Sequence, residues 1–158
     1  MALILLRVVF AFGAALGFAI LLNIERRKAL FAGFGGAFSW LFYELTLLGF
    51  GTVGFSLFVG SLAMGLYSEF MARKLQSPAT VFYIPGFVPL VPGSNVYFTV
   101  QAAAQGTPDE AMAQLFLTLI YSAAIALGLI VASAIVAIYK NIGRTNLKKF
   151  MKEVKKEQ

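Results

Sequence analysis

Three prolines and two glycines interrupt one of the apolar runs of this chain, where the segment from Pro85 to Phe98 reads PGFVPLVPGSNVYF. Each proline in a continuous helix removes one backbone hydrogen bond and leaves a carbonyl without its donor. Gly93 bends at little cost, and Ser94 and Asn95 are good N-cap residues for a second half-helix that would end near Ala104. The pattern predicts a helix that stops at the prolines and then starts again.

A helix that restarts inside a membrane has chemistry of its own. Its first turn carries unpaired N–H groups and a positive dipole end, which attract carboxylates. Broken helices of this kind form substrate sites in many secondary transporters. The predicted substrate path comprises Pro89, Pro92, Gly93, Ser94, Asn95, Tyr97 and Gln101. The spacing of the last three residues does not put them on one helix face, and the alternative is a kinked helix with a packing role only.

Three ionisable residues fall within apolar runs, and such residues are functional candidates because burying their charge costs about 2.5–3.5 kcal/mol. Arg7 and Glu44 are expected at similar depth, where they form an ion pair or an outer gate, or else reach the surface separately. Glu69 precedes Arg73 by four residues, which predicts a salt bridge on one helix face. Since the chain has no histidine, Glu44 and Glu69 are also candidate proton carriers.

The composition is that of an integral membrane protein. Hydrophobic residues make up 59% of the chain and charged residues 13%, with a mean hydropathy of +0.82, whereas a soluble domain is about half apolar and a quarter charged. Cysteine and histidine are both absent, which excludes disulfides, thiol nucleophiles, thiolate metal sites and imidazole bases. We therefore expect no catalytic residue, no metal and no cofactor, and an intramembrane enzyme is disfavoured.

Five apolar runs organise the sequence. Each holds about 20 residues or more, which at 1.5 Å per residue crosses a hydrocarbon core of about 30 Å. Their backbone groups must be satisfied internally, so we expect helices. The sequence predicts an all-α integral membrane protein with five transmembrane helices in residues 1–139, the fourth broken by the Pro-x-x-Pro-Gly run. The runs are Ala2–Leu22, which we do not take as a signal peptide, Ala29–Leu48, Thr52–Met71, Pro78–Ala104 and Ala111–Tyr139.

The basic residues predict the orientation. Every Lys and Arg except Arg7 falls in 26–28, in 73–74 or from Lys140 onward, and five crossings place these groups on one side. The opposite connections contain no Lys or Arg, and one of them carries Asp109 and Glu110. The positive-inside rule then gives an N-out, C-in protein of the cell inner (plasma) membrane.

Residues 140–158 form a basic tail with apolar residues at helical spacing, namely Leu147, Phe150, Met151 and Val154. Such a helix suits the anionic lipids of the inner leaflet, and a frayed, solvated tail is the alternative. No nucleic-acid partner is expected, because the topology already accounts for the positive charge.

Small residues within the runs predict close helix packing. Gly13 and Gly17 form a G-x-x-x-G motif in the first run. Gly33, Gly36, Gly60 and Gly65 are expected to pack in the same way, within the chain or against a partner.

Three features carry a resemblance to a known family: the PLVPG run from Pro89 to Gly93, the aromatic Tyr97 four residues later, and Leu22-Asn23 before a basic connection. Together they resemble the small subunit of the two-component threonine/serine exporter family, over nearly the whole sequence. In fused members of that family this module resembles the C-terminal half of a single transporter chain.

The resemblance implies a five-helix module that exports threonine, serine or, in some split members, dicarboxylates, by use of the proton gradient. It also implies a larger partner subunit with its own five-helix half and a hydrophilic N-terminal domain, so we expect this chain to supply half of a transporter. Whether two copies also associate stays open. The alternative function is a non-transporting membrane scaffold or assembly subunit.

Overall fold

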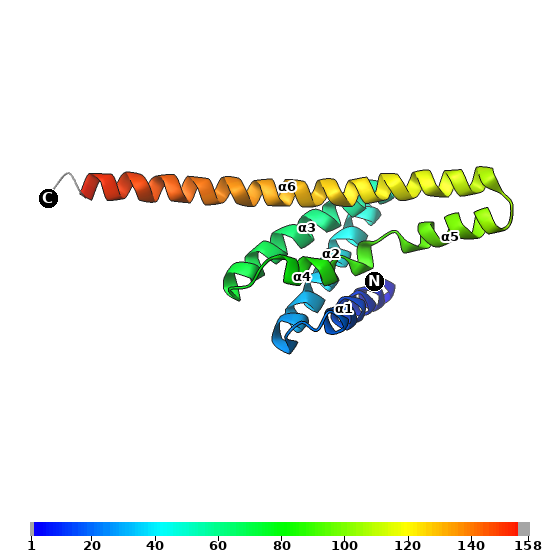
Figure 1. Cartoon of the computed structure of the whole chain (residues 1–158), viewed down its shortest axis with the longest axis horizontal. Helices are drawn as coiled ribbons and strands as arrows, with labels where there is room; N and C mark the ends of the chain where they lie inside the picture. The colour runs from blue at the N-terminus through cyan, green and yellow to red at the C-terminus, as the bar shows by residue number, and fades with distance from the viewer. Residues whose placement is uncertain (1, 155–158) are drawn as a thin grey trace.

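The computed structural model describes the backbone of residues 2–154 and the side chains of residues 3–140, and all of its regular structure is helical. Figure 1 shows a group of tilted helices beneath one very long helix. In chain order the elements are α1 (Ala2–Leu21), α2 (Arg26–Phe50), α3 (Val53–Lys74), α4 (Thr80–Gly86), the 3₁₀ helix η1 (Val88–Leu90), α5 (Gly93–Ala104) and α6 (Pro108–Val154).

Four of these helices are long and apolar enough to cross a membrane: α1, α2, α3 and the Pro108–Lys140 part of α6. The all-helical, multi-pass membrane fold predicted from the sequence is confirmed at this level. The expected fourth crossing is not one continuous helix, because Thr80–Leu90 forms only a shorter apolar stretch and α5 follows after a gap. The predicted break therefore exists.

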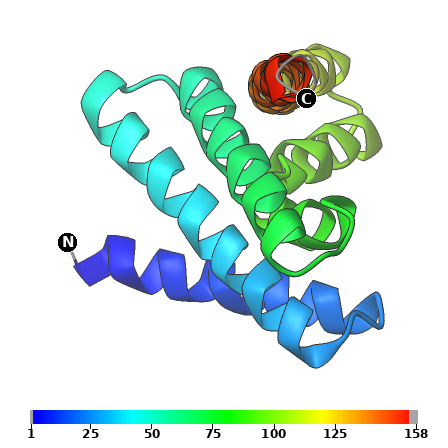
Figure 2. The same cartoon turned by 90° about the vertical axis from the view of Figure 1, so that its left-hand side faces the viewer.

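The first three helices pack side by side through small residues. Helices α1 and α2 are in contact at Gly36. A Cβ atom added to this glycine would lie only 2.5 Å from Ala15 Cβ. Helices α2 and α3 are in contact at Gly60, where an added Cβ atom would lie 3.0 Å from the Ser39 carbonyl oxygen. Figure 2 shows α2 and α3 as neighbours, with α1 crossing beneath α2. These glycines let the helix backbones approach closely, as in other membrane bundles.

Helix α6 runs parallel to α3. Gly65 of α3 contacts Ala132 of α6, Gly128 of α6 contacts Ser61 of α3, and Glu69 lies beside Lys140. The predicted packing role is confirmed for Gly33, Gly36, Gly60 and Gly65, each of which has a close neighbour within the chain. Gly13 and Gly17 have no described atom within 4 Å of the added carbon, so their motif makes no close helix contact among the described residues.

The broken segment forms much of the protein core. Phe82, Pro85 and Leu90 are among the largest side chains that are fully buried. Gly86 lies against Met64 and Gly36, so that any side chain at Gly86 would collide with the methionine. Because Met64 and Gly36 belong to α3 and α2, the first half of the break lies between these helices.

The prediction that Ser94 and Asn95 cap the second half-helix is wrong. Helix α5 already begins at Gly93, its N-cap is Pro92, and no side chain caps it. The Pro92 carbonyl accepts the N–H of Val96 at 3.2 Å. This bond closes the first turn early, so both polar residues fall inside the helix.

Helix α6 starts at Pro108, three residues before the predicted apolar run, and its backbone stays helical to Val154. The side chains from residue 141 onward lie outside the described residues. The amphipathic tail at Leu147, Phe150, Met151 and Val154, and the domain boundary at residue 139, therefore stay predictions.

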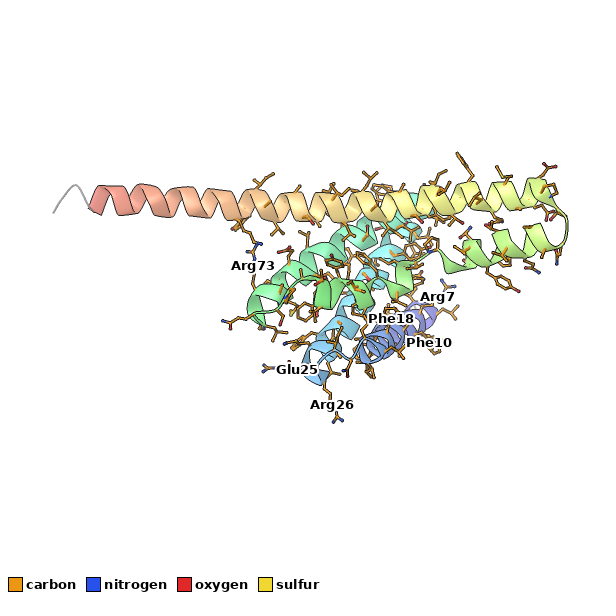
Figure 3. All side chains as sticks on the ribbon, viewed as in Figure 1. Arg7, Phe10, Phe18, Glu25, Arg26 and Arg73 are labelled. Atoms are coloured by element: carbon orange, nitrogen blue, oxygen red, sulfur yellow. The ribbon has the colours of Figure 1, made fainter. Side chains whose placement is uncertain are left out.

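The described basic side chains are unequally distributed over the bundle. Figure 3 shows Arg26 and Arg73 at the end that holds the α1–α2 and α3–α4 connections, and Arg7 toward the other end. Lys140 belongs to the first group, because its ammonium lies 3.4 Å from Glu69 near the end of α3. The separation matches what the positive-inside rule requires, while the orientation itself stays a prediction.

We predict that Gly128→Ala destabilises the bundle by about 1–3 kcal/mol, the usual cost of overpacking. The added carbon would lie 2.5 Å from the Phe58 carbonyl oxygen and would also meet Ser61. Thermal unfolding of the detergent-purified chain measures the loss.

The matched control is Gly17→Ala, which meets no described atom within 4 Å. It should leave the stability unchanged or raise it slightly, because alanine favours a helix by up to about 1 kcal/mol over glycine. Equal destabilisation by both substitutions would contradict the α3–α6 contact.

Candidate functional site

A cavity of about 250 Å³ lies beside the break, between α1, α2 and η1. Pro89 of η1 contributes one wall, and Arg7 and Trp40 bring polar groups to it. The remaining lining residues are apolar, namely Phe10, Ala11 and Ala14. The structure thus brings two predicted site residues, Pro89 and Arg7, to one cavity.

An ion pair joins α1 to α2 at this cavity. Arg7 Nη1 donates to Glu44 Oε1 at 2.9 Å. The Arg7 side chain is 57% exposed, whereas that of Glu44 is only 5% exposed. The proposed pairing of these residues is therefore confirmed, and separate snorkelling of Glu44 is excluded by its burial. Their role as a gate stays a prediction.

The predicted salt bridge between Glu69 and Arg73 is wrong. Glu69 Oε2 instead accepts from Lys140 Nζ at 3.4 Å. The physical reason is tertiary: α6 runs parallel to α3 and brings Lys140 to the face that Glu69 occupies. Glu69 also lines a cavity of about 330 Å³ together with Tyr83 of α4 and residues of α6.

The two cavities border different parts of the broken segment. One contacts η1 through Pro89, and the other contacts α4 through Tyr83 and the preceding Ala79. Each also holds one of the ionisable residues of the spans, Arg7 in the first and Glu69 in the second. The structure does not bring these two charged residues together.

A third cluster lies where α5 packs on α6. Asn95 Nδ2 donates to Gln114 Oε1 at 3.1 Å. Gln101 and Gln114 share a cleft of about 290 Å³ with Gln105 and Glu110. Asn95 and Gln101 therefore face α6, while Tyr97 is 63% exposed and its ring contacts Phe98. This agrees with the expectation that the three residues do not share a face.

The remaining predicted residues lie in the connection itself. Pro92 is half-buried, whereas Gly93 and Ser94 are exposed at the start of α5. No described atom lies within 4 Å of a side-chain carbon built on Gly93. Gly93 and Ser94 are thus accessible from outside the chain.

The sequence analysis missed Trp40. Its ring lines the Pro89 cavity and contacts the Tyr43 ring at 4.9 Å. Its indole Nε1 is buried and has no acceptor among the described residues. A signal was available, because the single tryptophan of the chain occurs in the interior of an apolar run and its N–H needs a partner.

The chain matches a known protein family. The family described as "Threonine/Serine exporter, ThrE" matches residues 7–135. This range covers most of the chain and includes Arg7, Glu44, the break and the start of α6. The chain belongs to the threonine/serine exporter family. The predicted resemblance is thereby confirmed.

Membership of the threonine/serine exporter family makes this chain a multi-pass protein of a transporter family, not an enzyme. No curated protein and no solved structure matches the chain. The roles of individual residues in this exporter-family protein therefore rest on its own geometry.

We predict that exchanging Arg7 and Glu44 restores stability that either single reversal removes. Arg7→Glu alone would place two carboxylates together, and Glu44→Arg alone two guanidinium groups. Breaking a buried pair costs about 3–5 kcal/mol, and we expect about 3 kcal/mol here because Arg7 is half exposed. Thermal unfolding of the two single variants and the double variant measures the difference.

The neutral substitutions give a second check. Arg7→Gln should destabilise the protein more than Glu44→Gln, because it leaves the buried Glu44 carboxylate without its partner. If the double reversal is no more stable than the single ones, the pair does not hold α1 to α2.

Proposed function

We propose that this chain is a membrane subunit of a secondary transporter that exports threonine, serine or small dicarboxylates. The family match supports export as the activity. The observation that carries the proposal is the break between α4 and α5, which lies inside the bundle and borders a cavity that holds an arginine. Family membership alone would not point to this part of the chain as the site.

The depth of the break supports a substrate site. Gly86 lies against Met64, and Leu90 lies against Gly60. Both α3 residues are near the middle of that helix (Val53–Lys74). Secondary transporters place broken helices and their substrate sites near the bilayer midplane, where irregular backbone lines a cavity.

The proposal includes coupling to the proton gradient. Glu44 and Glu69 are the only acidic residues of α1 to α3. Glu44 pairs with Arg7, and Glu69 pairs with Lys140. Protonation of either carboxylate would therefore release its basic partner. We propose that Glu44 and Arg7 form a gate at the end of the bundle away from the basic connections. Glu69 is the candidate proton carrier at the other end.

The proposal also includes a larger partner subunit. The apolar part of α6, Pro108–Lys140, has 33 residues and a length of about 50 Å, against a hydrocarbon core of about 30 Å. In Figure 1 its first turns and α5 project together beyond α1 to α3. Large apolar side chains are exposed on this projecting pair, including Val96, Val100, Met112, Leu115, Phe116 and Leu119. Contact with a second membrane subunit would cover them.

We predict that export needs the break and the partner together. The chain would be expressed alone, with its larger partner, and with the partner while carrying Pro89→Ala/Pro92→Ala, or Pro92→Ala/Gly93→Leu. Alanine restores the missing N–H donors and favours one continuous helix. Export of threonine, serine and a four-carbon dicarboxylate from loaded vesicles should fall about tenfold or more in both break variants, which corresponds to about 1.4 kcal/mol.

The matched control is Pro108→Ala, at the first position of α6 and away from the break. It should retain export, because a proline at that position removes no helical hydrogen bond. Export by the chain without a partner would contradict the two-subunit proposal. No export by any pair, with both proteins folded in the membrane, would favour the scaffold function.

We predict that a cysteine at Ser94 reacts with a water-soluble thiol reagent in the membrane. Ser94 is exposed at the start of α5, and the native chain has no cysteine to remove. Ser68→Cys is the matched control, because Ser68 is fully buried in α3 and should stay unreactive. An unreactive Ser94→Cys, with the protein folded, would mean a dry break and a packing role.

A further inference from the structure

The cavity at Pro89 holds two hydrogen-bond donors that the bundle leaves incompletely used. The Arg7 guanidinium carries five N–H donors, and Glu44 is its one hydrogen-bond partner among the described residues. The Glu44 side chain is buried while more than half of the Arg7 side chain is exposed. More than half of the Arg7 side chain thus lies outside the packed bundle, and Arg7 itself lines the cavity.

Trp40 provides the second donor. Its ring lines the same cavity, and its Nε1 is the one buried side-chain polar atom without a partner in the part of the chain that the structure describes. Leaving such a donor unpaired costs about 1–3 kcal/mol. A ligand oxygen that reached this N–H would supply the missing acceptor.

We propose that this cavity binds the carboxylate of a small ligand through the Arg7 guanidinium and the Trp40 Nε1–H. The apolar wall of Phe10, Ala11, Ala14 and Pro89 would contact the carbon skeleton. Taking that ligand to be the exported solute rests on the proposed function. The volume of about 250 Å³ lies below the roughly 300–1,000 Å³ of pockets for drug-sized molecules, which suits a small acid.

The charge of the site decides between two kinds of acid. Glu44 lies 2.9 Å from Arg7, so the pair is neutral as a whole. A ligand with one carboxylate and one ammonium brings no net charge to this neutral pair. A dicarboxylate would bring its second negative charge toward the buried Glu44 carboxylate, which is unfavourable in a medium of low dielectric constant. An amino acid should therefore bind more tightly than a dicarboxylate of similar length.

Pro89 links this site to the break. It is the central residue of η1, whose fold includes the bond from Leu90 N–H to the Phe87 carbonyl at 2.8 Å. Straightening the segment into a helix would move Pro89 away from Arg7 and open the cavity wall. A ligand held against this wall would thus stabilise the broken form.

Trp40 makes the proposal directly measurable. It is the only tryptophan of the chain, so the intrinsic tryptophan fluorescence of the purified full chain in lipid vesicles without other protein reports on this cavity alone. The probes are threonine, threonine amide, which lacks the carboxylate, and succinate. We expect a saturable change with threonine, none with the amide, and binding of succinate about tenfold weaker than that of threonine.

Two variants test the donors. Arg7→Gln/Glu44→Gln removes both charges while leaving a neutral pair, and it should abolish the fluorescence response without unfolding the chain. Glu25→Gln/Lys28→Gln is the matched control, because it neutralises a 2.9 Å ion pair at the start of α2 and should leave the response intact. Trp40→Phe keeps an aromatic ring but loses the indole N–H, and binding of radiolabelled threonine should weaken about tenfold.

The outcomes separate this site from the proposed function. Export without any saturable fluorescence response would overturn the carboxylate site and leave the exporter proposal intact. A response that threonine amide also produces, or that survives in Arg7→Gln/Glu44→Gln, would likewise overturn it. A carboxylate-specific response in a protein that exports nothing with its partner would support the site and overturn its assignment to an exported solute.

Discussion

A lipid bilayer offers no hydrogen-bond partners to a helix that stops halfway across it. The segment from Gly86 to Gly93 therefore depends on surrounding protein and on its own turns. Helices α1, α2 and α3 provide that surrounding, and Phe82, Pro85 and Leu90 are buried among them. The break is thus not a local defect of one helix, because the other helices are arranged around it.

Close approach of the helices allows the broken segment to be buried. Glycine at positions 36, 60 and 86 admits a neighbouring backbone or the Met64 side chain at distances that no larger residue allows. The buried serines add no unsatisfied groups, since Ser39, Ser56, Ser61 and Ser68 each donate to a carbonyl of their own helix. In membranes, where packing rather than the hydrophobic effect drives helix association, such small residues hold the bundle together.

The protein has two unlike parts as a consequence. Around α4 and η1 the side chains interlock, whereas α5 and the first turns of α6 pack chiefly on each other and expose large apolar residues. The charged groups follow the same division. Arg7 and Glu44 pair beside η1, Glu69 and Lys140 pair at the end with the basic connections, and the projecting pair carries amide side chains along its cleft. In the proposed two-subunit transporter, the first part would form the site and the second would contact the partner.

The sequence by itself determined the membrane class, the helical elements, the break at the prolines and the family. These features depend on composition, on local backbone chemistry and on motifs that occur within a few residues of each other. It also placed Arg7 and Glu44 at one depth, because both lie a few residues from the same ends of adjacent antiparallel helices. The N-cap of α5 was misplaced by two or three residues, because the Pro92 carbonyl closes the first turn before the polar residues Ser94 and Asn95.

Only the tertiary structure decided which side chains meet across the bundle. Glu69 pairs with Lys140 and not with Arg73, because α6 lies parallel to α3 and its register brings a distant residue closer than a neighbour on the same helix. Trp40 joins Arg7 and Pro89 at one cavity for the same reason. Local sequence sets where a helix starts and stops, but the rotation and register of packed helices come from contacts between residues far apart in the chain.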